Sequence, residues 1–177
     1  MAKSALEKYF RKIVAPDEKI HEDVWAPLLR ARNTGDFGDM NFALSWNPIT
    51  NPVTLSVNHA HDFDQYLIFT GGDGTNMDDL GGMVELTLSK DGVNMEVFTI
   101  TKATCVYVPA GLYHSPVNFK KINDPKKPII FQMLYFKSPD EYKMKFEDPA
   151  AEEESKRQAE KVAMLEKELK EKKAHDS

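Results

Sequence analysis

The sequence predicts an all-β protein: a β-sandwich or closed β-barrel with an N-terminal helical extension and a C-terminal helix. Short runs of β-branched and aromatic residues alternate with turn signals between residues 52 and 136. No long helical pattern interrupts these runs, which favours a barrel or sandwich over an α/β fold. Residues 149–177 then change to strong helix formers without glycine or a further proline.

The length of 177 residues favours a single domain. Within it we expect an N-terminal extension over residues 1–51, the barrel over residues 52–148 and a charged helix over residues 149–177. A chain of this size buries enough surface to fold without disulfides or a structural metal.

Two short helices and one strand are expected in the N-terminal extension. In residues 5–14 the apolar side chains fall on one helical face, and Pro16 ends the pattern. A second helix is predicted for residues 23–30, and an extended segment for residues 40–46. We therefore expect the extension to form two helices followed by a strand.

Six extended runs are predicted within the barrel. They begin at residues 53, 65, 83, 95, 104 and 128. The sequence Ser-Lys-Asp-Gly at residues 89–92 separates two β-branched runs and indicates a hairpin. The glycine-rich residues 71–82 are expected to form a long loop.

The predicted C-terminal helix carries pairs of opposite charge at i,i+4 spacing, such as Glu152 with Lys156. Val162, Leu165 and Leu169 form a thin apolar seam at heptad spacing. Two interpretations stay open: a solvated tail helix, or a helix that docks on a partner subunit.

The net charge, the apolar runs and the single cysteine limit which partners and cellular locations are expected for the protein. The formal net charge is -5, which argues against nucleic acid and anionic membranes as partners, because both attract basic surfaces. No apolar run has the length of a membrane span or the pattern of a signal peptide. The single cysteine, Cys105, cannot form an internal disulfide and is expected to be a small buried side chain. We expect a cytoplasmic protein that acts on a small molecule.

Two short segments contain the candidate metal ligands. His59 and His61 are two residues apart, so on a strand both imidazoles point to the same side. Gln65 is the first residue of the next extended run. Its side chain can reach the same metal as the two imidazoles, from the adjacent strand. His114 follows a turn at Pro109 and Gly111. Three imidazoles from separate elements form a nitrogen-rich site for a transition metal.

These segments resemble the two sequence motifs of the cupin superfamily. The first motif is His-x-His followed by Glu and Gly, and the corresponding residues are His59, His61, Gln65 and Gly72. The second motif is Pro-x-Gly-x-x-His-x-x-x-Asn, and the corresponding residues are Pro109, Gly111, His114 and Asn118. The resemblance covers about residues 53–136. It implies a jelly-roll barrel, one divalent transition metal ion (Fe, Mn, Ni, Zn or Cu) and a homodimer.

The sequence departs from the family pattern most clearly at Gln65, where the usual ligand is glutamate. Its neutral amide offers only a carbonyl oxygen to a metal. The metal would stay electron-poor, which favours Lewis-acid chemistry on an anionic molecule over oxygen activation. Direct ligation by Gln65, a role for it in holding water or substrate, and replacement by Asp62 or Asp64 all stay open.

Several other residues are candidates for the pocket. Tyr113, beside His114, is the candidate acid or base. Arg30 and Arg32 are candidates to hold a substrate carboxylate, although the sequence does not place them near the histidines. Candidate wall residues are Trp46, Phe63, Tyr66, Tyr107, Met133 and Tyr135.

The function expected from these features is that of a divalent-metal-dependent cupin enzyme acting on a small polar, anionic molecule, of isomerase, lyase or dioxygenase type. The alternative is a non-catalytic cupin module that binds a small ligand or a sugar.

Overall fold

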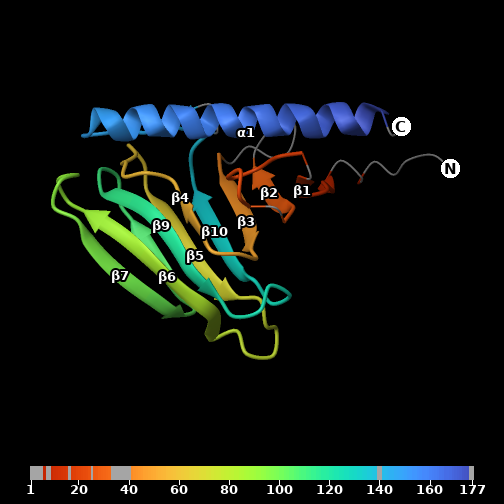
Figure 1. Cartoon of the computed structure of the whole chain (residues 1–177), viewed down its shortest axis with the longest axis horizontal. Coiled ribbons are helices and arrows are strands. Elements are labelled where there is room, and N and C mark those ends of the chain that lie inside the picture. The colour runs from red at the N-terminus through yellow and green to blue at the C-terminus, as the bar shows by residue number, and fades with distance from the viewer. Residues whose placement is uncertain are drawn as a thin grey trace.

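Two antiparallel sheets and one long helix make up the computed structural model of the chain (Figure 1). The structure describes residues 6, 9–15, 17–24, 26–32, 41–138 and 141–175. The all-β class with a C-terminal helix, predicted from the sequence, is confirmed.

The larger sheet has six strands in the order β1-β2-β3-β10-β5-β8. These are β1 (Val14–Ala15), β2 (Leu28–Arg32), β3 (Ala43–Ile49), β10 (Ile129–Tyr135), β5 (Gln65–Gly71) and β8 (Thr104–Val108). Strands distant in sequence are neighbours here, since β10 pairs with both β3 and β5. The N-terminal segment therefore contributes strands to the same sheet as the predicted barrel.

The smaller sheet has four strands in the order β4-β9-β6-β7. These are β4 (Val53–Leu55), β9 (Tyr113–Ile122), β6 (Asp79–Ser89) and β7 (Glu96–Lys102). The pairing of β6 with β7 confirms the hairpin predicted around residues 89–92.

The two sheets face each other across one apolar core. Phe69 and Phe131 come from the larger sheet and Phe119 from the smaller one. All three are buried, and their ring centroids lie 5.1 to 6.3 Å apart. Alternating burial along β3 and β5 follows from the two-residue repeat of a strand. Cys105, expected to be buried, is exposed instead, because it lies on the outer face of β8.

The predicted N-terminal helices do not form in the described residues. Residues 28–32, at the end of the helix predicted for residues 23–30, form β2, which pairs with β3. Helix propensity is a weak preference, and pairing of a strand with buried Leu28 on its inner side overrides it. The helix predicted for residues 5–14 lies partly outside the described residues. Of the rest, residues 10–13 have no regular structure and Phe10 is 81% exposed.

The helix α1 (Pro149–His175) lies across the ends of strands from both sheets (Figure 1). None of its residues is fully buried. Its half-buried residues form a stripe, most of it at heptad spacing: Ala151, Glu154, Ser155, Gln158, Val162, Leu165, Glu166 and Leu169. Polar contacts attach it to the N-terminal segment: the Nζ of Lys161 lies 2.7 Å from Glu22, and the backbone N–H of Lys19 donates to Glu166 at 2.9 Å. The helix therefore packs on its own chain rather than forming a free solvated tail.

Among the described residues, no helix is both long and apolar enough to cross a membrane.

Candidate metal centre

The two histidine motifs meet through their backbones. His59 and His114 form an antiparallel bridge, with N···O distances of 3.1 and 2.8 Å. Ala60 forms a second bridge on the other side, with Lys145. The segment carrying His59 and His61 is therefore held between the start of β9 and the segment that precedes α1.

A β-bulge in β9 turns His114 towards the interior. His114 pairs with Leu88 and Val117 pairs with Leu86, so three residue steps on β9 oppose two on β6. One extra residue reverses the alternation of a strand. The bulge includes Ser115, whose φ of 78° lies in the left-handed region. His114 consequently shares the inner face with Val117.

All three imidazoles are oriented by backbone carbonyl groups. The Nδ1 atoms of His59 and His61 each lie 2.6 Å from a carbonyl oxygen, those of Val57 and Lys143, and the Nδ1 of His114 lies 3.1 Å from that of Leu112. A carbonyl oxygen only accepts hydrogen bonds, so each Nδ1 must carry the proton. Each Nε2 then carries the lone pair, which is the form that binds a metal.

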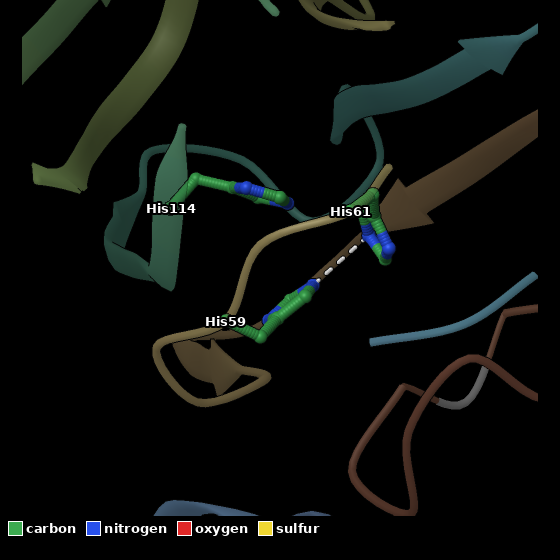
Figure 2. Close-up of side chains that lie close together, drawn as sticks. All are labelled: His59, His61 and His114. Atoms are coloured by element: carbon green, nitrogen blue, oxygen red, sulfur yellow. Dashed lines mark hydrogen bonds between the residues drawn. The ribbon is translucent and has the colours of Figure 1, made fainter. Parts of the chain in front are cut away.

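The three Nε2 lone pairs converge (Figure 2). The Nε2 atoms of His59 and His61 are 3.2 Å apart, and one ligand atom from each of the three histidines fits within 4.8 Å. Two nitrogens bound at about 2.1 Å to one ion are themselves about 3 Å apart. Lone pairs that face each other at this distance need a cation or a proton between them. The geometry therefore fits a bound metal ion.

Burial keeps the histidines neutral. Desolvation lowers the pKa of His59 to about 4 and that of His114 to about 3, and neighbouring histidines add to both shifts. The pKa of His61 is also lowered, mainly by burial. Neutral imidazole is the ligand form, so no proton has to be displaced from these three side chains near neutral pH.

Gln65, the first residue of β5, joins this group. It is buried, and its amide Nε2 lies 2.6 Å from the Nε2 of His114. A half-turn of the amide exchanges its nitrogen and oxygen, which are distinguished only by their hydrogen bonds. With the oxygen turned inward, the side chain presents a fourth ligand atom to the space that the three histidines enclose.

Other predicted site residues point elsewhere. Asp62 forms an ion pair with Lys137 at 2.8 Å, and Asp64 accepts hydrogen bonds from Tyr107 and the Ala110 N–H. Both carboxylates are exposed, which disfavours them as ligands.

Tyr113 is buried beside His114, but adjacent residues on a strand face opposite sides. Its hydroxyl donates a hydrogen bond to Glu147. A catalytic role for Tyr113 stays a prediction that its position does not favour.

A cavity of about 250 Å³ opens beside the candidate metal centre. His59, Gln65 and His114 are among the residues that line it. Leu55, Leu67, Val117, Phe131 and Met133 form its apolar walls. The helix α1 contributes Ser155, Gln158, Ala159 and Val162, and the remaining lining residues are Ile20, His21, Ser56, Ser115, Tyr142 and Met144. No lysine, arginine or carboxylate is among the described residues that line this cavity.

Some residues that contact the histidines had no signal in the sequence. The ring of Tyr142 lies 4.6 Å from that of His61, centroid to centroid, and also lines the cavity. Tyr142 and Lys143 belong to an irregular segment without a motif. Of the predicted wall residues, Phe63 stacks on His61 at 4.6 Å and Met133 lines the cavity, whereas Tyr66 and Tyr107 are exposed and contact each other.

The solved structures to which this chain is similar include those of two bacterial proteins. A point mutant of oxalate decarboxylase from Bacillus subtilis is 16% identical at a TM-score of 0.43, covering 73% of this chain and 29% of its own. The capsular polysaccharide assembling protein CapF from Staphylococcus aureus is 11% identical at a TM-score of 0.43, covering 71% and 32%. This chain thus spans less than a third of the length of either protein. No family model and no curated protein matches it.

Proposed function

We propose that this cupin-fold chain is a divalent-metal-dependent enzyme that acts on a small polar, anionic molecule. The observation that supports this most is the common orientation of three imidazoles. Each holds its Nδ1 proton on a backbone carbonyl and turns its Nε2 lone pair to one shared point. Such outer contacts fix the tautomer of a metal ligand. His59, His61, His114 and Gln65 would hold the ion.

The ligand set determines the charge of the centre. Three imidazoles with lowered pKa values and one amide are all neutral, so a bound divalent ion keeps its full charge. Such an ion supplies Lewis-acid polarisation of a carbonyl or carboxylate oxygen. This chemistry suits an isomerase or lyase, and a three-histidine centre also permits a dioxygenase. The anionic group of the substrate would lie next to the ion.

The residues around the cavity provide enclosure. Its apolar walls exclude water from the reacting end, which strengthens the electrostatic attraction between the ion and an anion. Gln158 and Ser155 of α1 add neutral hydrogen-bonding groups to its lining. The cavity therefore suits a molecule with one polar end at the metal and an apolar body.

Metal analysis of the purified protein tests this proposal. After reconstitution with each candidate metal (Fe, Mn, Ni, Zn, Cu), we expect close to one equivalent of one of them. His114→Ala should lose most of that metal. His175→Ala is the matched control, because His175 is exposed at the end of α1, and it should retain the metal. Full retention by His114→Ala, or less than about one-tenth equivalent in the parent protein, contradicts the proposal.

A non-catalytic binding module is the second candidate. It is favoured by the small number of candidate general acids and bases: apart from the histidines of the candidate metal centre, the described residues that line the cavity offer His21 and Tyr142 but no carboxylate, lysine or arginine. The two candidates differ in turnover. Metal-loaded protein that binds a ligand tightly but returns it unchanged would support the binding module.

A cytoplasmic location and a homodimer complete the proposal. Light scattering on the purified chain tests the homodimer, which the cupin resemblance suggested. A monomeric mass at working concentration would contradict it.

A further inference from the structure

One row of inward-facing residues crosses four strands of the larger sheet and ends at the candidate metal centre. Arg32 pairs with Ala43, Ala43 with Tyr135, and Tyr135 with Gln65. Paired residues on neighbouring strands share one face of a sheet. Three strand spacings separate Arg32 from Gln65, which is roughly 14 Å between their backbones.

A second row runs parallel to the first. Arg30 pairs with Ser45, Ser45 with Met133, and Met133 with Leu67. Leu67 and Met133 line the cavity beside the metal centre. Both arginine side chains therefore start on the inner face of the sheet that carries Gln65, and not on its outer surface.

These arginines line a second cavity of about 310 Å³. Ser45 and Tyr135 line it as neutral polar groups. Ile20, Met133 and Tyr142 line both this cavity and the one beside the histidines. The two cavities are thus neighbours that share one wall.

The second cavity has the positive charge that the first one lacks. Arg30 and Arg32 both form ion pairs with a single carboxylate, that of Glu18, at 3.5 Å in the case of Arg32. Arginine stays protonated in proteins, so two guanidinium groups share one negative charge. Burial raises the pKa of Tyr135, whose phenol therefore stays neutral. An excess of positive charge remains beside the cavity.

We propose that the second cavity is a carboxylate subsite, formed by Arg30, Arg32, Ser45 and Tyr135 and called the arginine subsite below. Guanidinium groups match the two oxygens of a carboxylate in a planar, bidentate contact. The apolar residues between the two cavities would accommodate the middle of the ligand. This inference rests on the proposed function and specifies its substrate: a small molecule with an anionic, metal-binding oxygen group at one end, an apolar body and a second anionic group, a carboxylate, at the other end.

Glu18 has a defined place in this proposal. Its carboxylate takes the position of an anion on the two arginines, so it competes with the carboxylate of a ligand. Neutralising Glu18 should therefore strengthen anion binding, whereas a purely structural ion pair predicts no gain. This difference separates a binding role from a stabilising role of the same contacts.

Calorimetric titration of benzoate into metal-free protein tests the subsite. Benzoate has a carboxylate and an apolar ring, and without metal it can only use groups of the chain. We expect Arg32→Gln to weaken binding by about tenfold, the usual effect of losing one charged hydrogen bond. Glu18→Gln should tighten binding several-fold. Lys120→Gln, which removes a surface cation on β9 paired with Glu85, should change nothing.

Several results would overturn the subsite. These are no saturable binding of benzoate by the parent protein, equal affinity in Arg32→Gln, or no gain in Glu18→Gln. Arg32→Lys keeps the charge without the planar fork and should fall between the parent and Arg32→Gln, which covers the case that the glutamine variant folds poorly. The proposed metal function is judged separately, by metal content, because this titration needs no metal.

Discussion

His59 and His114, 55 positions apart in the chain, exchange both backbone hydrogen bonds, with the N–H of each donating to the carbonyl oxygen of the other. Their ring centroids lie 4.4 Å apart. The relative position of these two imidazoles is therefore set by backbone contacts rather than by long flexible side chains. A metal centre built on such a pair is largely formed before the ion binds, which lowers the entropic cost of binding.

Gln65→Glu tests the charge argument. We expect the variant to keep its metal and to bind an anionic ligand at the metal at least about tenfold more weakly, since like charges about 4 Å apart repel by about 4 kcal/mol at an effective dielectric near 20. Inhibition or calorimetry with acetate as the probe measures this. Gln132→Glu adds the same charge on the neighbouring strand β10, at a position that does not line the cavity, and should leave anion affinity unchanged. Equal affinity in the Gln65→Glu protein would count against a neutral amide at the metal.

The bulge at Ser115 gives a stability prediction. A side chain other than glycine in the left-handed region costs roughly 1–3 kcal/mol, and a β-branched one costs more. Ser115→Val should therefore lower the free energy of unfolding by about 2 kcal/mol and weaken metal binding through His114. Ser115→Gly should retain both. Urea denaturation and metal titration of the two variants decide the matter, and equal behaviour of valine and glycine would argue against the bulge.

The buried histidines predict how the stability of the metal-free protein depends on pH. Burial lowers the pKa of His59 to about 4 and of His114 to about 3, from an ordinary value of 6.5. Between these values the unfolded chain binds protons that the folded chain does not, so stability is complete above pH 6.5 and falls as the pH drops. The slope is at most about 1.4 kcal/mol per pH unit for each histidine.

Urea denaturation from about pH 7.5 to about pH 5 measures this slope. The double variant His59→Gln, His114→Gln should show a flatter dependence over the same range. If the free energy of unfolding of the parent protein stays constant as the pH is lowered from 6.5, the two histidines are not buried in the neutral form.

The placement of α1 over the cavity predicts how fast metal is lost. Val162 lines the cavity and is half-buried, whereas Met164 is 66% exposed on the same helix. Val162→Asp should displace the helix and accelerate removal of metal by a chelator. Met164→Asp adds the same charge without removing a contact, so its rate should match the parent. Stopped-flow chelation compares the two, and equal rates would mean that α1 does not limit access.

That His59, His61 and His114 lie together could be predicted from the sequence because the signals are local and paired. His59 and His61 are two residues apart, and the turn at Pro109 and Gly111 places His114 at the start of a strand. The β-branched runs predicted the strands of both sheets for a similar reason, since two-residue alternation is a property of each strand by itself.

The parts that escaped prediction depend on contacts between distant segments. Strand β9 contains Pro116 and polar residues, which obscure its alternation, and its bulge is defined only against β6. Residues 28–32, taken by themselves, favour a helix, but they form a strand because they pair with β3. Arg30 and Arg32 were candidates for holding a carboxylate without a known position, and only the register of the sheet places them on its inner face.

The most direct test of the account is a crystal structure of metal-loaded protein with the ion located by anomalous scattering. The account predicts one peak about 2.1 Å from the Nε2 atoms of His59, His61 and His114, with the oxygen of Gln65 turned towards it. A peak at another group, such as His21 with Glu22 and Asp23, which also lie close enough to share an ion, would contradict it. So would metal-loaded crystals without a peak among the three histidines.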